Sequence, residues 1–76
     1  MEVKVYSTPT CPYCTMVKEY LSSKSISFQG IDVSLDKAAA DEMIKVSGQM
    51  GVPTIVIGSE VIVGFDKEAI NKALNL

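Results

Sequence analysis

Two cysteines separated by two residues carry the most reactive chemistry in this 76-residue sequence. They form Cys11-Pro12-Tyr13-Cys14, and the sequence holds no other cysteine. Within one helical turn their Cα atoms would lie about 5 to 6 Å apart, which a disulfide can span. A bridge that closes so short a ring stabilises little, and small disulfide scaffolds normally carry about four to eight cysteines. We therefore interpret the pair as reactive, able to pass between dithiol and disulfide.

The surrounding residues predict that Cys11 opens a helix. Residues 3–6 read as a short strand, residues 7–10 are turn formers, and Pro12 suits the first helical position. The free backbone N–H groups and the dipole at a helix N-terminus favour a thiolate over a thiol. We expect Cys11 to be the exposed attacking sulfur and Cys14, one turn inward, to be the shielded resolving sulfur.

Helical and strand patterns alternate along the rest of the chain. In the first helix Cys14, Val17 and Leu21 share one face, with Lys18 and Lys24 facing water. A second strand is predicted over residues 26–32. A second helix follows to about residue 47, and Ser34 or Asp36 can cap it. The predicted inner face of this helix consists of Leu35, Ala39, Met43 and Val46, and Gly48 is its predicted stop. The predicted inward anchors of the second strand are Phe28 and Ile31.

The last third of the chain predicts a hairpin and a final helix. Residues 54–57 and 61–63 are two strands separated by a Gly-containing turn, which suits an antiparallel pair. Asp66 can cap a last helix with Ala69, Ile70, Ala73 and Leu74 facing inward. The element order is βαβ-αββα, and a helix joins the first two strands, so they should be parallel. The predicted fold is α/β, a four-stranded mixed sheet with three helices.

Composition narrows the functional classes. We expect one domain over residues 1–76, because the chain is too short for two. Seven Lys against nine acidic residues give a net charge of −2, which argues against a nucleic-acid partner. Neither a membrane span nor a signal peptide is apparent, so we expect a cytoplasmic protein. With no His and two cysteines, one chain lacks the four ligands that zinc normally takes.

Three motifs in this order resemble glutaredoxin. They are Cys11-Pro12-Tyr13-Cys14 after the first strand, Gly48-Gln49 before Gly51-Val52-Pro53-Thr54, and Gly64-Phe65-Asp66 before the last helix. The resemblance spans the chain from Val3 to about Leu74. It implies a thioredoxin fold, thiol–disulfide exchange, and glutathione as a co-substrate with no tightly bound cofactor. It also implies a monomer whose partners are glutathione and disulfide-containing or glutathionylated proteins.

The same resemblance implies roles for individual residues. Cys11 corresponds to the family nucleophile and Cys14 to its resolving thiol. The Val52 backbone, followed by a cis-proline, corresponds to the segment that pairs with the cysteinyl part of glutathione. An Asp at a helix start, beside free N–H groups, can take the amine and carboxylate of the γ-glutamyl end. The implied glutathione contacts are Tyr13, Gln49, Val52, Pro53, Phe65 and Asp66, with Pro12 and Gly64 shaping the site.

Four positions depart from the family pattern. Thr8 and Met50 stand where the family often carries a basic residue, Gly51 where a Thr is common, and Val63 where a Gly is usual. Two cationic or polar anchors for the glycine carboxylate of glutathione are therefore missing. Because a surface charge contact contributes about 0.2–1 kcal/mol, we expect weakened binding. Lys45 and Lys67 are the candidates to replace the missing charge.

Other interpretations of these residues remain open. The same fold and cysteine pair could serve a redoxin that a flavoprotein thioredoxin reductase reduces, which the missing anchors favour. Two chains could together supply four thiolates to an iron–sulfur cluster or a metal, although Pro12 stiffens the turn against it. A pure binding module is a third reading. Individually, Tyr13 suits an exposed helix start, Val52-Pro53 an ordinary strand entry, and Asp66 a simple helix cap.

Overall fold

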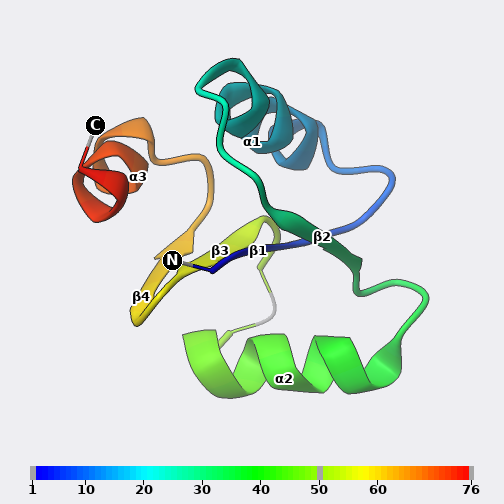
Figure 1. Cartoon of the computed structure of the whole chain (residues 1–76). Coiled ribbons are helices and arrows are strands. Elements are labelled where there is room, and N and C mark those ends of the chain that lie inside the picture. The colour runs from blue at the N-terminus through cyan, green and yellow to red at the C-terminus, as the bar shows by residue number, and fades with distance from the viewer. Residues whose placement is uncertain (1, 50, 76) are drawn as a thin grey trace.

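The computed structural model describes residues 2–49 and 51–75, whose four strands form one mixed sheet (Figure 1). β1 (Val3–Ser7) runs parallel to β2 (Gln29–Asp32) and antiparallel to β3 (Thr54–Ile57). β3 is in turn antiparallel to β4 (Glu60–Val63), so the strand order is β2-β1-β3-β4. The predicted mixed sheet, its parallel first pair and its hairpin are confirmed.

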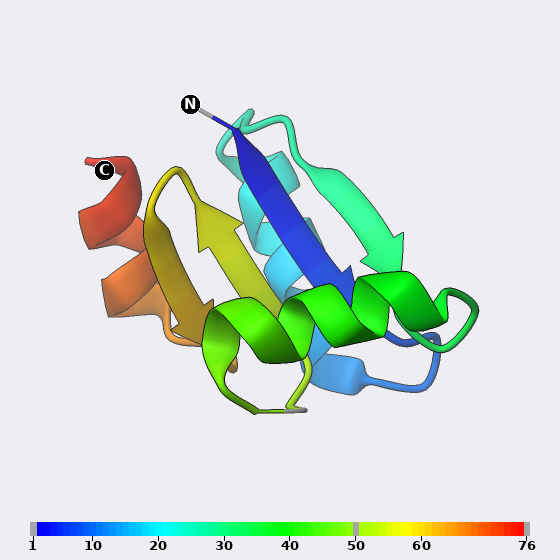
Figure 2. The same ribbon diagram turned by 90° about the horizontal axis from the view of Figure 1, so that it is seen from below.

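Helices cover both faces of the sheet, as Figure 2 shows. α2 (Lys37–Ser47) lies alone on one face, while α1 (Pro12–Ser23) and α3 (Lys67–Leu74) lie on the other. α2 ends at Gly48, whose φ of 77° suits a residue without a Cβ. The predicted three helices and the predicted glycine stop are confirmed.

Each helix begins at a side chain that accepts a hydrogen bond from the backbone three residues on. Asp36 accepts from Ala39 at the start of α2, and Asp66 accepts from Ala69 at the start of α3. Of the two candidate caps for the second helix, Asp36 is therefore the one used. At the start of α1 a cysteine takes this place, and the site is built on it.

The main core lies between the sheet and the face that α1 and α3 cover. Its members alternate along the strands and recur at helical spacing on α1, so these two periodicities are confirmed. Burial of such side chains contributes about 25 cal/mol per Å² of apolar surface. The cluster consists of Val3, Val5, Val17, Leu21, Ile55, Ile57, Ile62 and Ile70.

The second strand is shorter than the sequence predicts. The expected strand over residues 26–32 begins only at Gln29, which pairs with Lys4 near the start of β1. Ile26 and Phe28 precede the strand and pack, partly buried, against the core. Their apolar character reflects burial of a loop rather than strand pairing, so the predicted boundary was wrong by three residues.

The predicted inner face of α2 is wrong at two of its four positions. Ala39 and Met43 are buried as expected, but Leu35 is 85% exposed and Val46 is 43% exposed. Leu35 precedes the Asp36 cap, so helical periodicity does not apply to it. Val46 lies in the last turn of a helix that has its face of the sheet to itself. It borders a cavity between α2 and the sheet that Tyr6 and Val56 also line, which leaves it partly exposed.

Candidate functional site

Three loops meet at one end of the sheet. Tyr6 at the end of β1 pairs with Thr54 at the start of β3, and Thr54 also pairs with Val63 at the end of β4. The segments after β1, before β3 and after β4 therefore leave the sheet at the same end. These are the segments that carry the three sequence motifs, so the fold brings the motifs together.

Cys11 is the N-cap of α1, as the sequence predicts. Its backbone is extended, with φ −93° and ψ 109°, and its Sγ accepts a hydrogen bond from the Cys14 N–H at 3.1 Å. Pro12 holds the first helical position, where its missing N–H removes no helix bond. The Cys11 sulfur is half-buried. A sulfur held by a backbone donor at a helix N-terminus is a good place for negative charge.

Cys14 is shielded where Cys11 is accessible. Only 1% of its surface is exposed, in line with Val17 and Leu21 on the buried face of α1. Burial, and then the hydrogen bond and charge of Cys11, raise the pKa of Cys14 to about 11. The Thr8 backbone and Lys18 act in the opposite direction. Both cysteines are free thiols, so the structure describes the dithiol form.

Tyr13 lies on the open side of the same turn. Its side chain is 58% exposed and points into neither the core nor a cap, and Met16 one turn later is also exposed. An aromatic ring in this position offers a flat apolar surface beside Cys11 to whatever approaches the thiol. Tyr13 therefore contributes to neither the buried core nor a helix cap.

The segment before β3 is fixed by two hydrogen bonds. The Val52-Pro53 peptide bond is cis, as the family resemblance implies. The Pro53 carbonyl accepts a hydrogen bond from the Gly64 N–H at 2.8 Å, and the buried Thr54 hydroxyl donates to the Gly51 carbonyl at 2.7 Å. The first bond ties the second motif to the third. Thr54 had no predicted role of its own, although a polar residue at the start of an apolar strand was a visible signal.

The third motif begins α3. Gly64 has a φ of 83°, which suits glycine, and the Asp66 carboxylate accepts the Ala69 N–H at 3.2 Å. Phe65 packs partly buried against the core, its ring edge-on to Tyr20 at 6.1 Å between centroids. Asp66 therefore caps α3, and because the residue is exposed its second carboxylate oxygen remains available to a ligand.

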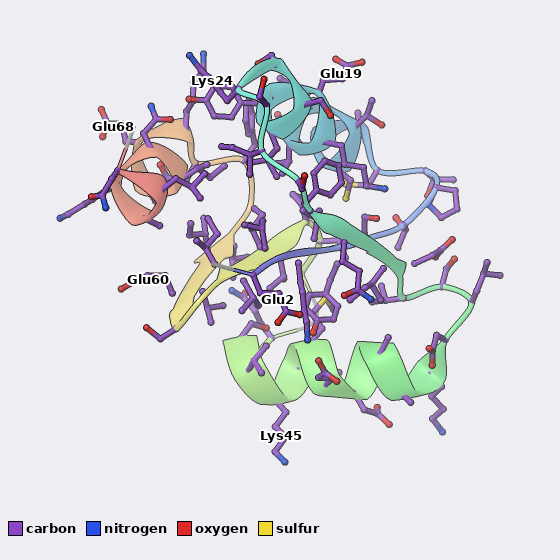
Figure 3. The ribbon with its side chains drawn as sticks, in the orientation of Figure 1. Glu2, Glu19, Lys24, Lys45, Glu60 and Glu68 are labelled. Carbon is purple, nitrogen blue, oxygen red and sulfur yellow. The ribbon has the colours of Figure 1, made fainter. Side chains whose placement is uncertain are left out.

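The remaining candidates surround the segment after α2. Gln49 is exposed, and its side-chain oxygen lies about 4.0 Å from where a Cβ on Gly51 would stand. Met50 lies outside the described residues. Lys45 projects from the outer side of α2, away from the sheet (Figure 3). The Lys67 ammonium lies over the Tyr20 ring, 5.2 Å from its centroid.

Lys18 is placed differently from its expected solvent-facing position. It is half-buried, and its Cε and Nζ lie 3.7 and 3.8 Å from where a Cβ on Gly30 would stand. The spacing of four residues from Cys14 was the signal in the sequence, since residues four apart are neighbours on a helix.

The part of the chain that the structure describes forms neither a metal site of its own nor a membrane-spanning helix. Among residues 2–49 and 51–75, no group of three or more His, Cys, Asp or Glu side chains is arranged to hold a metal ion. In that same part of the chain, every helix is too short or too polar to cross a membrane.

The chain resembles known proteins along most of its length. The glutaredoxin family model matches residues 3–62. An uncharacterized glutaredoxin-like 8.6 kDa protein in the rubredoxin operon of Clostridium pasteurianum is 49% identical, over 95% of this chain and 96% of its own. Glutaredoxin 3 of Escherichia coli is 45% identical over 64 residues, 84% of this chain and 77% of its own. A variant of the thioredoxin-like protein BC3987 superposes with a TM-score of 0.92 at 35% identity, over 97% and 95% of the two chains.

Proposed function

Because this chain belongs to the glutaredoxin family and has its thioredoxin-like fold, we propose that it is a glutathione-dependent thiol–disulfide oxidoreductase. Its substrates are protein disulfides and glutathione mixed disulfides, and glutathione is a co-substrate rather than a bound cofactor. The family supports thiol oxidoreductase chemistry. That glutathione is the reductant is part of our proposal. We also propose that the protein is cytoplasmic, since the reducing cytoplasm keeps such a cysteine pair as a dithiol. We propose that it acts as a monomer.

The single observation that carries the proposal is the unequal placement of the two sulfurs. Cys11 Sγ accepts the Cys14 N–H at 3.1 Å at the open end of α1, while the Cys14 thiol is buried beneath it. Exchange needs one thiolate that substrates can reach and a second thiol that only an attached substrate meets. The first turn of α1 offers this pair.

Reduction of a substrate disulfide takes two exchanges, after which glutathione regenerates the dithiol. The Cys11 thiolate attacks one sulfur of a disulfide R–S–S–R′, forming Cys11–S–S–R and releasing R′–S⁻, which takes up a proton. Cys14 loses its proton and attacks the Cys11 sulfur, forming the Cys11–Cys14 disulfide and releasing R–S⁻. Two glutathione thiols then restore the dithiol and leave as oxidised glutathione. When R is itself glutathione, a second glutathione can replace Cys14 in the resolving step.

The recognition of glutathione rests on the two segments beside the thiols. The half-buried Val52 precedes the start of β3, where its backbone can pair with an extended peptide. Asp66 keeps one carboxylate oxygen for Ala69 and can offer the other to the γ-glutamyl amine. Tyr13 supplies an exposed ring two residues after Cys11. These features support a peptide-like thiol as the reductant.

One observation favours a second candidate, a redoxin reduced by a flavoprotein thioredoxin reductase. The chain places the uncharged residues Thr8, Gln49 and Gly51 around the region where a glycine carboxylate would bind. Lys45 points away from the sheet (Figure 3), and Lys67 lies over the Tyr20 ring. A site without a cation for that carboxylate binds glutathione more weakly, by about 0.2–1 kcal/mol per missing contact.

The deciding experiment starts from the oxidised protein, with its intramolecular disulfide formed. Reduced glutathione is added in millimolar excess, and free thiols and intact mass are followed with time. We expect rapid reduction with a transient glutathione adduct on Cys11. A parallel reaction uses NADPH with thioredoxin reductase. Reduction by the flavoprotein but not by glutathione would overturn the proposed reductant and leave the dithiol chemistry intact.

A matched variant separates recognition from folding at Asp66. Asn is as good a helix cap as Asp, so Asp66→Asn keeps the Ala69 hydrogen bond and removes only the charge. We expect reduction by glutathione to slow by roughly two- to fivefold, as for a surface charge contact. Reduction by dithiothreitol, which carries no γ-glutamyl group, should not change. Equal rates with glutathione would reduce Asp66 to a cap.

A further inference from the structure

Lys18 is a half-buried cation on the helix that carries both thiols. It lies one turn after Cys14 on α1, so the two residues are neighbours on the helix surface. Its side chain extends across β2 at Gly30, where its Cε and Nζ lie 3.7 and 3.8 Å from the position of a Cβ, the distance of ordinary van der Waals contact. The half-buried lysine side chain therefore lies against the sheet.

Few charged groups act on this part of the helix. The groups that influence Cys14 are Cys11 and Lys18 on its own helix and the Thr8 backbone from the preceding loop. Asp32 lies two residues after Gly30, on the same side of β2. The pKa of Asp32 is lowered, chiefly by the Ser34 hydroxyl and in smaller part by Lys18. Lys18 therefore favours the charged form of both a thiol and a carboxylate.

We propose that Lys18 is a positioning residue for the resolving step, its ammonium stabilising the Cys14 thiolate as that thiolate forms against a mixed disulfide on Cys11. The inference rests on the assignment of Cys14 as the resolving thiol. Burial disfavours the thiolate that this step requires, and a nearby cation that remains charged throughout offsets part of that cost. Lys18 binds no substrate and exchanges no proton in this role.

The electron and proton balance of the step is simple. In the mixed disulfide Cys11–S–S–R, the Cys14 thiol gives its proton to water and its thiolate attacks the Cys11 sulfur. The Cys11–Cys14 bond forms, the bond to R breaks, and R–S⁻ leaves and takes up a proton. Before the attack Cys11 carries no negative charge, since its sulfur is bonded to R. Lys18 is then the charged group on α1 that acts on Cys14.

The test uses one equivalent of 2,2′-dithiodipyridine, a neutral disulfide that releases a coloured and uncharged thione. Attack by Cys11 releases the first thione in a second-order phase, and resolution by Cys14 releases the second in a first-order phase. We expect Lys18→Met to slow the second phase by roughly three- to tenfold near neutral pH. The first phase should change much less, and the pH midpoint of the second phase should move upward. Lys18→Arg, which keeps the charge, should restore both.

The controls separate this role from a structural one. Lys24→Met removes an exposed lysine at the C-cap of α1, one whose ammonium lies over the Tyr20 ring, and should leave both phases unchanged. Thermal unfolding of each variant checks that the fold persists. An unchanged second phase and pH midpoint in Lys18→Met would overturn the proposal. Failure of the native protein to release a second thione would instead overturn the assignment of Cys14.

Discussion

The first turn of α1 and the two segments beside it are defined in different ways. In the first turn, two side chains of one chemical type differ through burial and a single backbone hydrogen bond. In the segments around Pro53 and Asp66, the geometry is fixed by backbone hydrogen bonds and a helix cap, and residues 49–57 carry no charged side chain. The first turn, with Cys11 and Cys14, is the reactive half of the site and contains both thiols that exchange requires. The segments around Pro53 and Asp66 are its recognition half, which offers a fixed backbone shape but no cation for the glycine carboxylate of glutathione.

The difference separates what the molecule does from what it works with. Thiol exchange depends on the two cysteines and on the start of one helix, so it would proceed with any reductant that reaches Cys11. Selection of the reductant depends on residues that can change without disturbing that helix. Loss of Cys11 should therefore act on every substrate, and changes in the neighbouring segments should act on glutathione alone.

The largest effect is expected from Cys11→Ser. A hydroxyl at this position is a far weaker nucleophile than a thiolate, so exchange with every disulfide should fall by at least about a thousandfold. The structure predicts intact folding, because a Ser at the same N-cap accepts the Cys14 N–H as well or better. The measurement is reduction of insulin disulfides and of a glutathionylated peptide. Substantial residual turnover of either would favour a binding role.

Cys14→Ser should split the two substrate classes. Without the resolving thiol, a mixed disulfide with a protein persists, and we expect reduction of protein disulfides to fall by roughly a hundredfold. Reduction of glutathione mixed disulfides should survive, since a second glutathione resolves them. The two assays already used for Cys11→Ser measure the ratio. Equal loss of both activities would show that Cys14 does more than resolve.

The parts of the fold that the sequence predicted well are those with a single dominant cause. Val17 and Leu21 repeat at helical spacing on a helix with a clear start, and Gly58 marks the hairpin turn with a φ of 60°. Leu35 failed because its apolar side chain suggested a helix face, whereas the cap that decides the helix start lies one residue later. A stronger local signal at Asp36 overruled the weaker periodicity.

The candidate site shows the same division. Cys11, Cys14 and Asp66 were placed correctly because a helix start constrains them in sequence and in space alike. Lys18 was missed, since a lysine on a helix is ordinarily solvated and its contact with Gly30 joins two different elements. The hydrogen bond from Gly64 to Pro53 was also missed, because it joins the residues that flank β4 and β3 and depends on the register of that hairpin.

Burial of Cys14 in the reactive half should make the folded protein less stable at alkaline pH. The pKa of Cys14 is raised by burial to about 11 from an ordinary 9.0, so the unfolded chain loses that proton first. Its stabilising contribution is complete below about pH 9 and is lost as the pH rises to about 11, at up to about 1.4 kcal/mol per pH unit. Urea unfolding of the reduced protein between pH 8 and 10.5 measures the decline.

Cys14→Ser is the control for this decline. It should remain nearly flat to pH 10, where Tyr6 begins to act with the same sign, because burial and its bond to Glu42 raise the pKa of that phenol to about 12. An equally steep decline in the variant between pH 8 and 10 would assign the effect to groups other than the resolving thiol.

The smallest effect is expected where the recognition half lacks charge. Thr8→Lys adds a cation three residues before Cys11, in the loop that reaches the site, and should lower the apparent KM for glutathione by up to about fivefold. Thr10→Lys adds the same charge at an exposed position of the same loop and is the matched control. A gain with Thr8→Lys alone would mean that the glutathione site is complete except for this charge. Equal values for both variants and the native protein would mean that geometry, and not a missing cation, limits glutathione, and would shift the weight toward a flavoprotein reductant.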